Sequence, residues 1–299
     1  MTKTQHGIVA CVIGATTWGF NGVVSQFLLS HYPVEPSWLA SIRMCLAGLF
    51  LTLMVLPTKR AEIRQMLHDP VSLRHLVLFA LFGLILSQFS YLSAIKNSNA
   101  GTATVLQTLS VVLMSLYLAV RFHKRPTGRE ILSVFLAFGG VYLAATNGNP
   151  STMVISPLGL TWGLIGAIAC VTYPVLSQGL AANWGAAVAN GLGMIIGGVF
   201  LSLPLQVWTV WPALDLTGWL AVAFIVIIGT ALSFTAFVTG ISEIGPMKAT
   251  LLGTLEPVVA SVTSAIALGT TFHTVELIGY ACIIATVFII ILQKKPAIS

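Results

Sequence analysis

Two ionisable residues interrupt segments that are otherwise apolar: Arg43 in residues 36–56 and Glu256 in residues 246–268. An isolated charge in such surroundings is costly, so it usually faces a cavity or a partner. The planar fork of Arg43 suits a carboxylate, and Glu256 suits an ammonium group or a titrating proton. The structural alternatives are a helix-packing ion pair or an extension toward the outer interface for Arg43, and a hydrogen-bonded acid at a kink for Glu256. If the two residues pair with each other, both are structural.

Uncharged polar and aromatic residues recur on single faces of the predicted helices, mostly at spacings of three or four residues. Aromatic rings beside a few amides and hydroxyls would suit an amphipathic solute with a large apolar side chain. The alternative is that Trp and Tyr form interfacial belts, as we expect for Trp208 and Trp211, and that Ser and Gln bond between helices. The predicted solute-binding residues are Trp18, Asn21, Arg43, Gln88, Tyr91, Gln107, Trp162, Tyr173, Asn190, Phe234 and Glu256.

Two prolines inside predicted helices, Pro174 and Pro257, are the predicted hinges, because proline removes a helical hydrogen bond. The alternative for both is a static kink.

Catalytic and metal-binding motifs are missing from the sequence. The cysteines occur singly at Cys11, Cys45, Cys170 and Cys282, without the clustering that a metal site or disulfide framework needs. The six histidines lie near the ends of predicted helices or in loops, with no His/Asp/Glu cluster. A membrane enzyme would need such a cluster, so we predict no catalytic residues, no metal and no cofactor.

Composition places these residues in a membrane protein. The chain has 299 residues, of which 57% are hydrophobic and 7% charged, and its mean hydropathy is +0.95. No Asp, Glu, Lys or Arg occurs from Ile131 to Leu214. One helical crossing takes about 20 residues, so this stretch contains several crossings. The apolar runs lack the alternation of outer-membrane strands, and the sequence therefore predicts an all-α integral membrane protein.

Turn residues divide the chain into ten predicted transmembrane helices. Their ranges are 7–29, 36–56, 74–95, 99–120, 128–146, 158–180, 185–204, 216–240, 246–268 and 274–293. Residues 59–69 are predicted as a short interfacial helix, with Ile63, Met66 and Leu67 facing lipid.

Basic residues predict the orientation. If both termini are cytoplasmic, nearly all basic loop residues lie inside, as the positive-inside rule requires. These are Lys3, Lys59, Arg60, Arg64, Arg74, Arg121, Lys124, Arg125, Arg129, Lys248, Lys294 and Lys295, whereas Lys96 lies in an outside loop.

The two halves of the chain repeat each other. Residues 13–15, 25–26 and 28 recur as 165–167, 177–178 and 180 at an offset of 152, and 103–104 and 108–109 recur as 249–250 and 254–255 at an offset of 146. Each half has five predicted helices, an odd number, so the halves cross the membrane in opposite directions. Inverted repeats are a basis of alternating access, with a solute site near the midplane.

The run from Ala94 to Ala103 resembles the junction of the third and fourth helices in the drug/metabolite transporter superfamily, EamA type, and so does the stretch from Gly240 to Pro257. Arg43, Glu130 and Glu276 also fit this resemblance, which covers the whole chain. The sequence departs from many members at 122–123 and 269–270, where they carry an acidic residue. Its first helix has no acid, which disfavours an antiporter of cationic drugs.

Within that superfamily the sequence is most similar to the YddG-type exporters of aromatic and other amino acids. The resemblance implies ten helices in two inverted five-helix repeats, residues 1–150 and 151–299, in a bacterial inner membrane. It further implies export of small amphipathic metabolites, aromatic or large neutral amino acids, by alternating access.

We expect uniport or exchange, and the alternative is a proton-coupled metabolite or drug antiporter that uses Glu256. A channel is a further alternative, which saturable, counterflow-stimulated transport would exclude. No phosphate-loop motif occurs, so we expect no nucleotide. The expected partners are a small-molecule substrate and the lipid bilayer, with no nucleic acid, and the oligomeric state stays open.

Overall fold

Helices form every regular element of the described chain, as the sequence predicts, and no strand occurs there. The computed structural model describes residues 2–121, 123, 127–149, 154–244, 252–253 and 255–291. The first half contains α1 (Lys3–His31), α2 (Pro36–His68), α3 (Pro70–Leu78), the π-helix η1 (Phe79–Ile85), α4 (Leu86–Asn97), α5 (Ala100–Thr108), α6 (Ser110–Arg121) and α7 (Gly128–Thr146). The second half contains α8 (Pro157–Trp184), α9 (Ala186–Leu205), the short 3-10 helix η2 (Val207–Thr209), α10 (Leu216–Val226), the π-helix η3 (Ile227–Leu232), α11 (Ser233–Ile244), α13 (Leu255–Leu268) and α14 (Thr274–Ile291).

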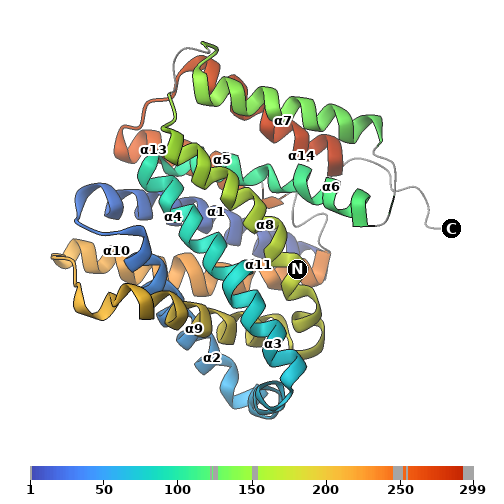
Figure 1. Cartoon of the computed structure of the whole chain (residues 1–299), viewed down its shortest axis with the longest axis vertical. Coiled ribbons are helices and arrows are strands. Elements are labelled where there is room, and N and C mark those ends of the chain that lie inside the picture. Colours follow the sequence, from blue (N-terminus) through green and yellow to red (C-terminus); the bar gives the residue numbers. More distant parts are fainter. Residues whose placement is uncertain are drawn as a thin grey trace.

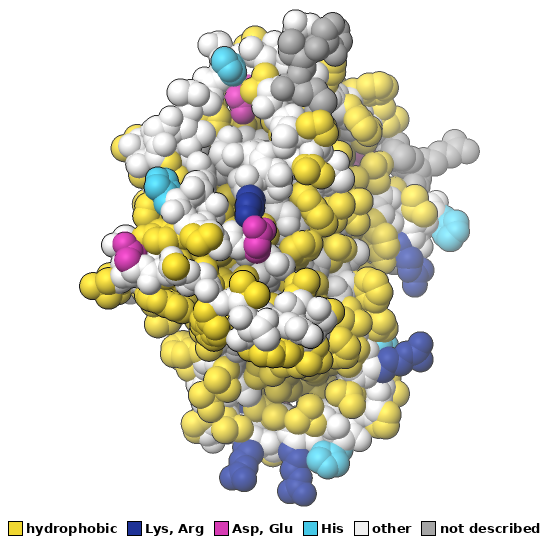
Figure 2. Space-filling view, turned by 60° about the vertical axis from the view of Figure 1, so that its left-hand side comes forward, with side chains coloured by type: hydrophobic (Ala, Val, Ile, Leu, Met, Phe, Trp, Pro, Cys, Tyr) yellow, Lys and Arg dark blue, Asp and Glu magenta, His cyan; other side chains and the backbone are white. Residues whose placement is uncertain are grey.

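These elements make ten membrane segments, because α3, η1 and α4 form one crossing, α5 and α6 another, and α10, η3 and α11 a third. Within the described part of the chain, eight segments are long and apolar enough to cross a bilayer, and α13 and α14 are shorter apolar helices. The start of the predicted ninth segment, 246–251, lies outside the described residues. Hydrophobic side chains cover much of the face that Figure 2 shows, and most of its Lys and Arg side chains lie along the lower and right-hand margins.

Contacts between helices come in equivalent pairs, which is the pattern that two inverted repeats produce. α1 packs on α11 and α13, and its repeat counterpart α8 packs on α4 and α5. The remaining counterparts pack on each other, α2 on α9 and α7 on α14, and the second pair lies side by side at one end of the molecule (Figure 1). Because each half has five crossings, the two halves have opposite directions. The boundary between residues 150 and 151 falls outside the described residues and stays a prediction.

The π-helices also follow the repeat. η1 and η3 interrupt the third and eighth crossings, and at the offset of 146 Gly83 of η1 is equivalent to Gly229 of η3. π-helical turns are rare and are frequent at functional sites. Their occurrence at equivalent positions indicates that the π-helical turn is a shared feature of both repeats.

The connector after the second crossing differs from the sequence prediction. α2 continues to His68, with non-helical backbone angles only at Lys59, where the chain kinks. Ile63 and Met66 of this extension are 8% and 0% exposed and belong to the protein core. The prediction that both face lipid is therefore wrong, because the kink directs them against neighbouring helices.

Glycines allow the closest helix contacts. A Cβ atom added at Gly140 of α7 would lie 2.7 Å from the carbonyl oxygen of Gly279 in α14, whereas a Cβ at the adjacent Gly139 would meet nothing within 4 Å. Small residues at such positions let backbones approach in membranes, where van der Waals packing drives association.

We expect Gly140→Ala to destabilise the protein by about 1–3 kcal/mol, because the methyl group forces α7 and α14 apart. Gly139→Ala is the matched control, and it should be neutral or stabilising by up to ~1 kcal/mol through helix propensity. Thermal unfolding of the purified protein in detergent measures both, and equal melting temperatures would show that this contact is not close-packed.

Candidate functional site

A cavity of about 200 Å³ lies near the middle of the helices and is lined by residues from both halves of the chain. Its lining residues are Trp18, Asn21, Arg43, Ser87, Gln88, Tyr91, Gln107, Cys170, Tyr173, Met194, Thr230, Phe234 and Glu256. One water needs roughly 10–15 Å³ of such a cavity, and sites for drug-sized ligands begin near ~300 Å³. The volume therefore fits a solute smaller than most drugs.

All of the predicted solute-binding residues except Trp162 and Asn190 lie in this wall. The side chain of Asn190 instead supports the site, because its Oδ1 atom accepts a 2.7 Å hydrogen bond from the Tyr173 hydroxyl. Trp162 packs edge-on against Phe89, with ring centroids 5.1 Å apart.

Four lining residues were not predicted from the sequence: Ser87, Cys170, Met194 and Thr230. The first two had a signal, because Ser87 lies four residues before Tyr91 and Cys170 lies three residues before Tyr173, each pair on one helix face. Met194 lies four residues after Asn190 and Thr230 four residues before Phe234, so the same spacing was present for both, although the surrounding runs are apolar.

Arg43 is a buried cation without an ionic partner in the described residues. Its side chain is 5% exposed, its Nε atom donates a 2.8 Å hydrogen bond to Thr230 Oγ1, and its Nη1 atom has no hydrogen-bond partner there. The Glu256 carboxylate faces the same cavity, yet no ion pair within 4.0 Å joins it to Arg43 in the part of the chain that the structure describes. The direct pairing that would make both residues structural is therefore not formed.

Two further polar atoms of the cavity wall have no hydrogen-bond partner among the described residues, Asn21 Oδ1 and the Tyr91 hydroxyl. Their residues are only 2% and 7% exposed, and a buried unsatisfied polar group costs about 1–3 kcal/mol. Tyr91 reaches its position because Gly22 has no side chain, since a Cβ there would lie 2.5 Å from the hydroxyl oxygen. Asn21 and Tyr91, like Arg43, are thus wall residues of the cavity that carry a buried polar atom without a partner among the described residues.

Aromatic rings form another part of the wall. Trp18 of α1 packs on Phe237 and Phe234 of α11, with ring centroids 4.7 and 6.5 Å apart. Tyr173 of α8 lies edge-on to Phe234 at 6.4 Å. The cavity therefore combines a charged and polar region with an aromatic face.

The predicted hinge residues lie in helices next to this wall. α8 continues through position 174, where the Pro174 side chain is outside the described residues. Pro257 is buried in the first turn of α13, directly after Glu256. Both remain predicted hinges.

Polar contacts join the two halves near the carboxyl end of α1. Gln26 Oε1 accepts hydrogen bonds from the Ala100 backbone N–H and from Ser264 Oγ, both 2.8 Å long. Its Nε2 atom donates to Thr270 Oγ1 at 3.0 Å. One amide thus links α1, α5, α13 and the loop that follows α13.

At the end of α1, the Tyr32 hydroxyl donates a 2.6 Å hydrogen bond to Asp215 at the start of α10. This bond lowers the pKa of the Asp215 carboxyl below its ordinary value. The contact keeps an acid charged at this edge of the protein.

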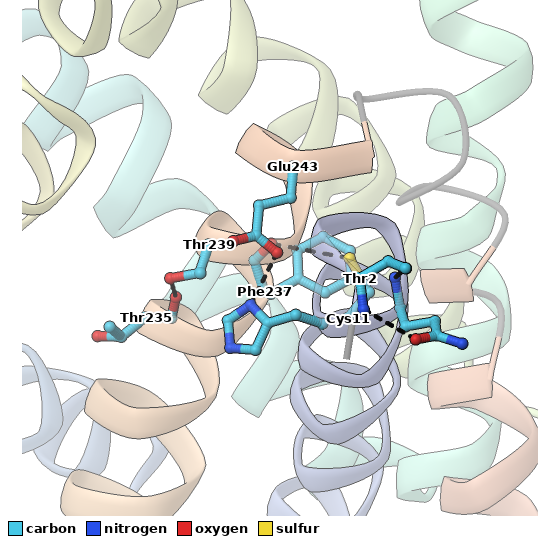
Figure 3. Close-up of polar contacts among 8 residues, drawn as sticks. Thr2, Cys11, Thr235, Phe237, Thr239 and Glu243 are labelled. Carbon is cyan, nitrogen blue, oxygen red and sulfur yellow. Dashed lines mark hydrogen bonds and ion pairs between the residues drawn. The ribbon is translucent and has the colours of Figure 1, made fainter.

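A second link between the halves lies at the amino end of α1 (Figure 3). His6 Nδ1 is 2.8 Å from Glu243 Oε2 on α11, and Cys11 Sγ is 3.9 Å from the Phe237 carbonyl oxygen. The cavity therefore lies between contacts that join the two halves at opposite ends of the same helix.

Comparisons with known proteins agree with this architecture. The model of the EamA-like transporter family matches residues 5–146 and 157–292, once in each half. The chain is 30% identical to the uncharacterized inner membrane transporter YicL of Salmonella typhimurium, over 99% of this chain and 98% of that protein. It is 25% identical to the uncharacterized inner membrane transporter YedA of Escherichia coli K12, over 94% and 91% of the two chains. It is also 25% identical to the uncharacterized transporter YyaM of Bacillus subtilis, over 87% of each chain.

A crystal structure of another protein superimposes on 96% of this chain and 96% of its own, with a TM-score of 0.61 and 18% identity, which supports the fold alone. The family model accounts for almost the whole chain and matches each five-helix half separately. The chain is a multi-pass membrane transporter that belongs to the EamA-like transporter family.

Proposed function

We propose that this transporter exports small zwitterionic, amphipathic metabolites, aromatic or large neutral amino acids, by alternating access. The observation that carries the proposal is that Arg43 and Glu256 face one small cavity without pairing with each other. A solute that carries both a carboxylate and an ammonium group would compensate both charges at once.

The energetic argument concerns uncompensated charge. Leaving one partner of a buried pair alone costs about 3–5 kcal/mol, so a cavity with two separated charges favours a ligand that neutralises both. The free Arg43 Nη1 atom and the Tyr91 hydroxyl would bind the carboxylate, and Glu256 would accept from the ammonium group. Trp18 and Phe234 would pack on the apolar side chain.

The inverted repeat supports alternating access, because two equivalent halves can exchange conformations around a shared site. We propose uniport or exchange, in a bacterial inner membrane with both termini in the cytoplasm. The basic residues of the α2 extension and of α3, among them Arg60, Arg64 and Arg74, support this orientation.

A second candidate is a proton-coupled metabolite or drug antiporter. It is favoured by Glu256 itself, which lines the cavity and has no ion-pair partner within the described residues. Such a carboxyl can carry a proton in exchange for the solute.

In reconstituted vesicles we expect saturable, counterflow-stimulated transport of Trp, Phe, Tyr or Met, because the cavity offers one group for each end of a zwitterion beside an aromatic wall. The measurement is uptake of each radiolabelled solute. Transport of quaternary amines with none of these amino acids would contradict the solute assignment.

We expect Arg43→Gln to raise the KM for phenylalanine about 10- to 100-fold, the effect of losing a hydrogen bond to a charged group. Arg129→Gln, at the exposed start of α7, is the matched control and should leave the KM unchanged. An unchanged KM in the Arg43 variant would show that the solute carboxylate does not bind to Arg43.

Flux with and without an imposed pH gradient separates uniport from proton coupling. We expect little gradient-driven accumulation by the unmodified protein, and we expect Glu256→Gln to weaken downhill flux because it loses an acceptor for the ammonium group. Strong gradient-driven accumulation that disappears in Glu256→Gln while downhill flux persists would establish the proton-coupled alternative instead.

A further inference from the structure

Thr230 connects the π-helix η3 to Arg43. Its side chain is 2% exposed, and its hydroxyl donates a 2.8 Å hydrogen bond to the Ile225 carbonyl, five residues earlier in the chain. Because the single hydroxyl proton is used there, the oxygen lone pairs are available to Arg43 Nε, which donates at 2.8 Å.

The π-helical turn decides where this hydroxyl points. In an α-helix a threonine hydroxyl bonds to a carbonyl three or four residues earlier, whereas here the acceptor is five residues earlier. One additional residue in a helix rotates everything after it by about 100°. Ser233 makes the same kind of bond, to the Ile228 carbonyl at 2.6 Å, so the register is shared by two consecutive turns.

A neutral partner has a particular consequence for Arg43. A carboxylate at this position would fix the guanidinium and also cancel its charge. The hydroxyl of Thr230 fixes Nε, and with it the plane of the guanidinium, while Nη1 stays free and no described carboxylate forms an ion pair with Arg43 within 4.0 Å. Arg43 is thereby oriented but remains available to an anion.

The neighbouring residue acts on the cavity too. A Cβ atom at Gly229 would collide first with the amide oxygen Oδ1 of Asn21 and would lie 2.8 Å from its Cβ, so the Asn21 side chain packs directly on the π-helical backbone. In the other half, a Cβ at Gly83 of η1 would lie 3.5 Å from the Cα atom of Tyr173, the repeat counterpart of Asn21 at the offset of 152. Each π-helix thus packs a glycine against the first helix of the opposite half.

We propose that Thr230 is a positioning residue for solute specificity, which presents Arg43 to the carboxylate of the transported amino acid. This inference rests on the proposed function. The π-helix η3 sets the direction of the hydroxyl, the hydroxyl orients the guanidinium, and the guanidinium selects solutes with a carboxylate over analogues without one.

The test compares phenylalanine with phenylalaninamide, which lacks the carboxylate, as inhibitors of phenylalanine uptake in vesicles. The unmodified protein should prefer phenylalanine. Thr230→Val replaces the hydroxyl with a methyl group, and it should raise the KM for phenylalanine about 3- to 10-fold, with a maximal rate within about twofold and a reduced preference over the amide. Thr230→Ser should restore both quantities, because serine offers the same donor and acceptor.

Ser233→Ala is the matched control, since it removes an equivalent hydroxyl bond within the same π-helical register without a contact to Arg43. If Thr230→Val matches Ser233→Ala, or if Thr230→Ser fails to restore the preference, the positioning role is wrong although the proposed function stands. If the unmodified protein itself does not prefer phenylalanine to its amide, the carboxylate site and the proposed function both fail. Thr230→Ala replaces the valine variant if the latter does not purify as a folded protein.

Discussion

A cation buried in the middle of a membrane protein must be held in place, and the way it is held decides whether it can bind anything. Arg43 is held by the hydroxyl of Thr230, a neutral group that orients the guanidinium without cancelling its positive charge. Glu256 lines the same cavity but forms no ion pair with Arg43. Desolvation makes each separated charge unfavourable by itself, so the cavity favours whichever ligand carries the complementary pair. The surrounding helices can be understood as the framework that keeps these two charges apart.

That framework is a symmetric backbone with an asymmetric lining. The repeat makes Asn21 equivalent to Tyr173, Trp18 to Cys170 and Gln88 to Phe234, and all six residues line the cavity. The first half contributes all three amides and the arginine, the second half contributes both sulfur-containing side chains and Glu256, and each half contributes two aromatic residues. Symmetry of the helices allows two related conformations, whereas asymmetry of the side chains gives the site a polar and an apolar part. Polar contacts join the halves at both ends of α1, and the proposed alternating access would have to rearrange them.

Much of this could be predicted from the sequence, because the relevant signals are local. Hydropathy and turn residues gave the ten segments, and the order of repeated residues gave the inverted halves. Spacing on single helix faces selected Asn21 on the first crossing and Gln88 with Tyr91 on the third, and all three residues line the cavity. These properties depend on the period of the helix and on the cost of polar groups in lipid, which act on each segment separately.

Other features depended on the tertiary structure, because they join residues that are distant in sequence or depend on a change of helical register. Asn190 lies behind Tyr173 and Trp162 packs on Phe89, although both are on faces that suited the cavity. Ile63 and Met66 pack inside the protein because a kink at Lys59 redirects their helix. Thr230 reaches Arg43 only through a π-helical turn within an apolar run. A helical period predicts which residues share a face, but only packing against other helices determines what that face meets.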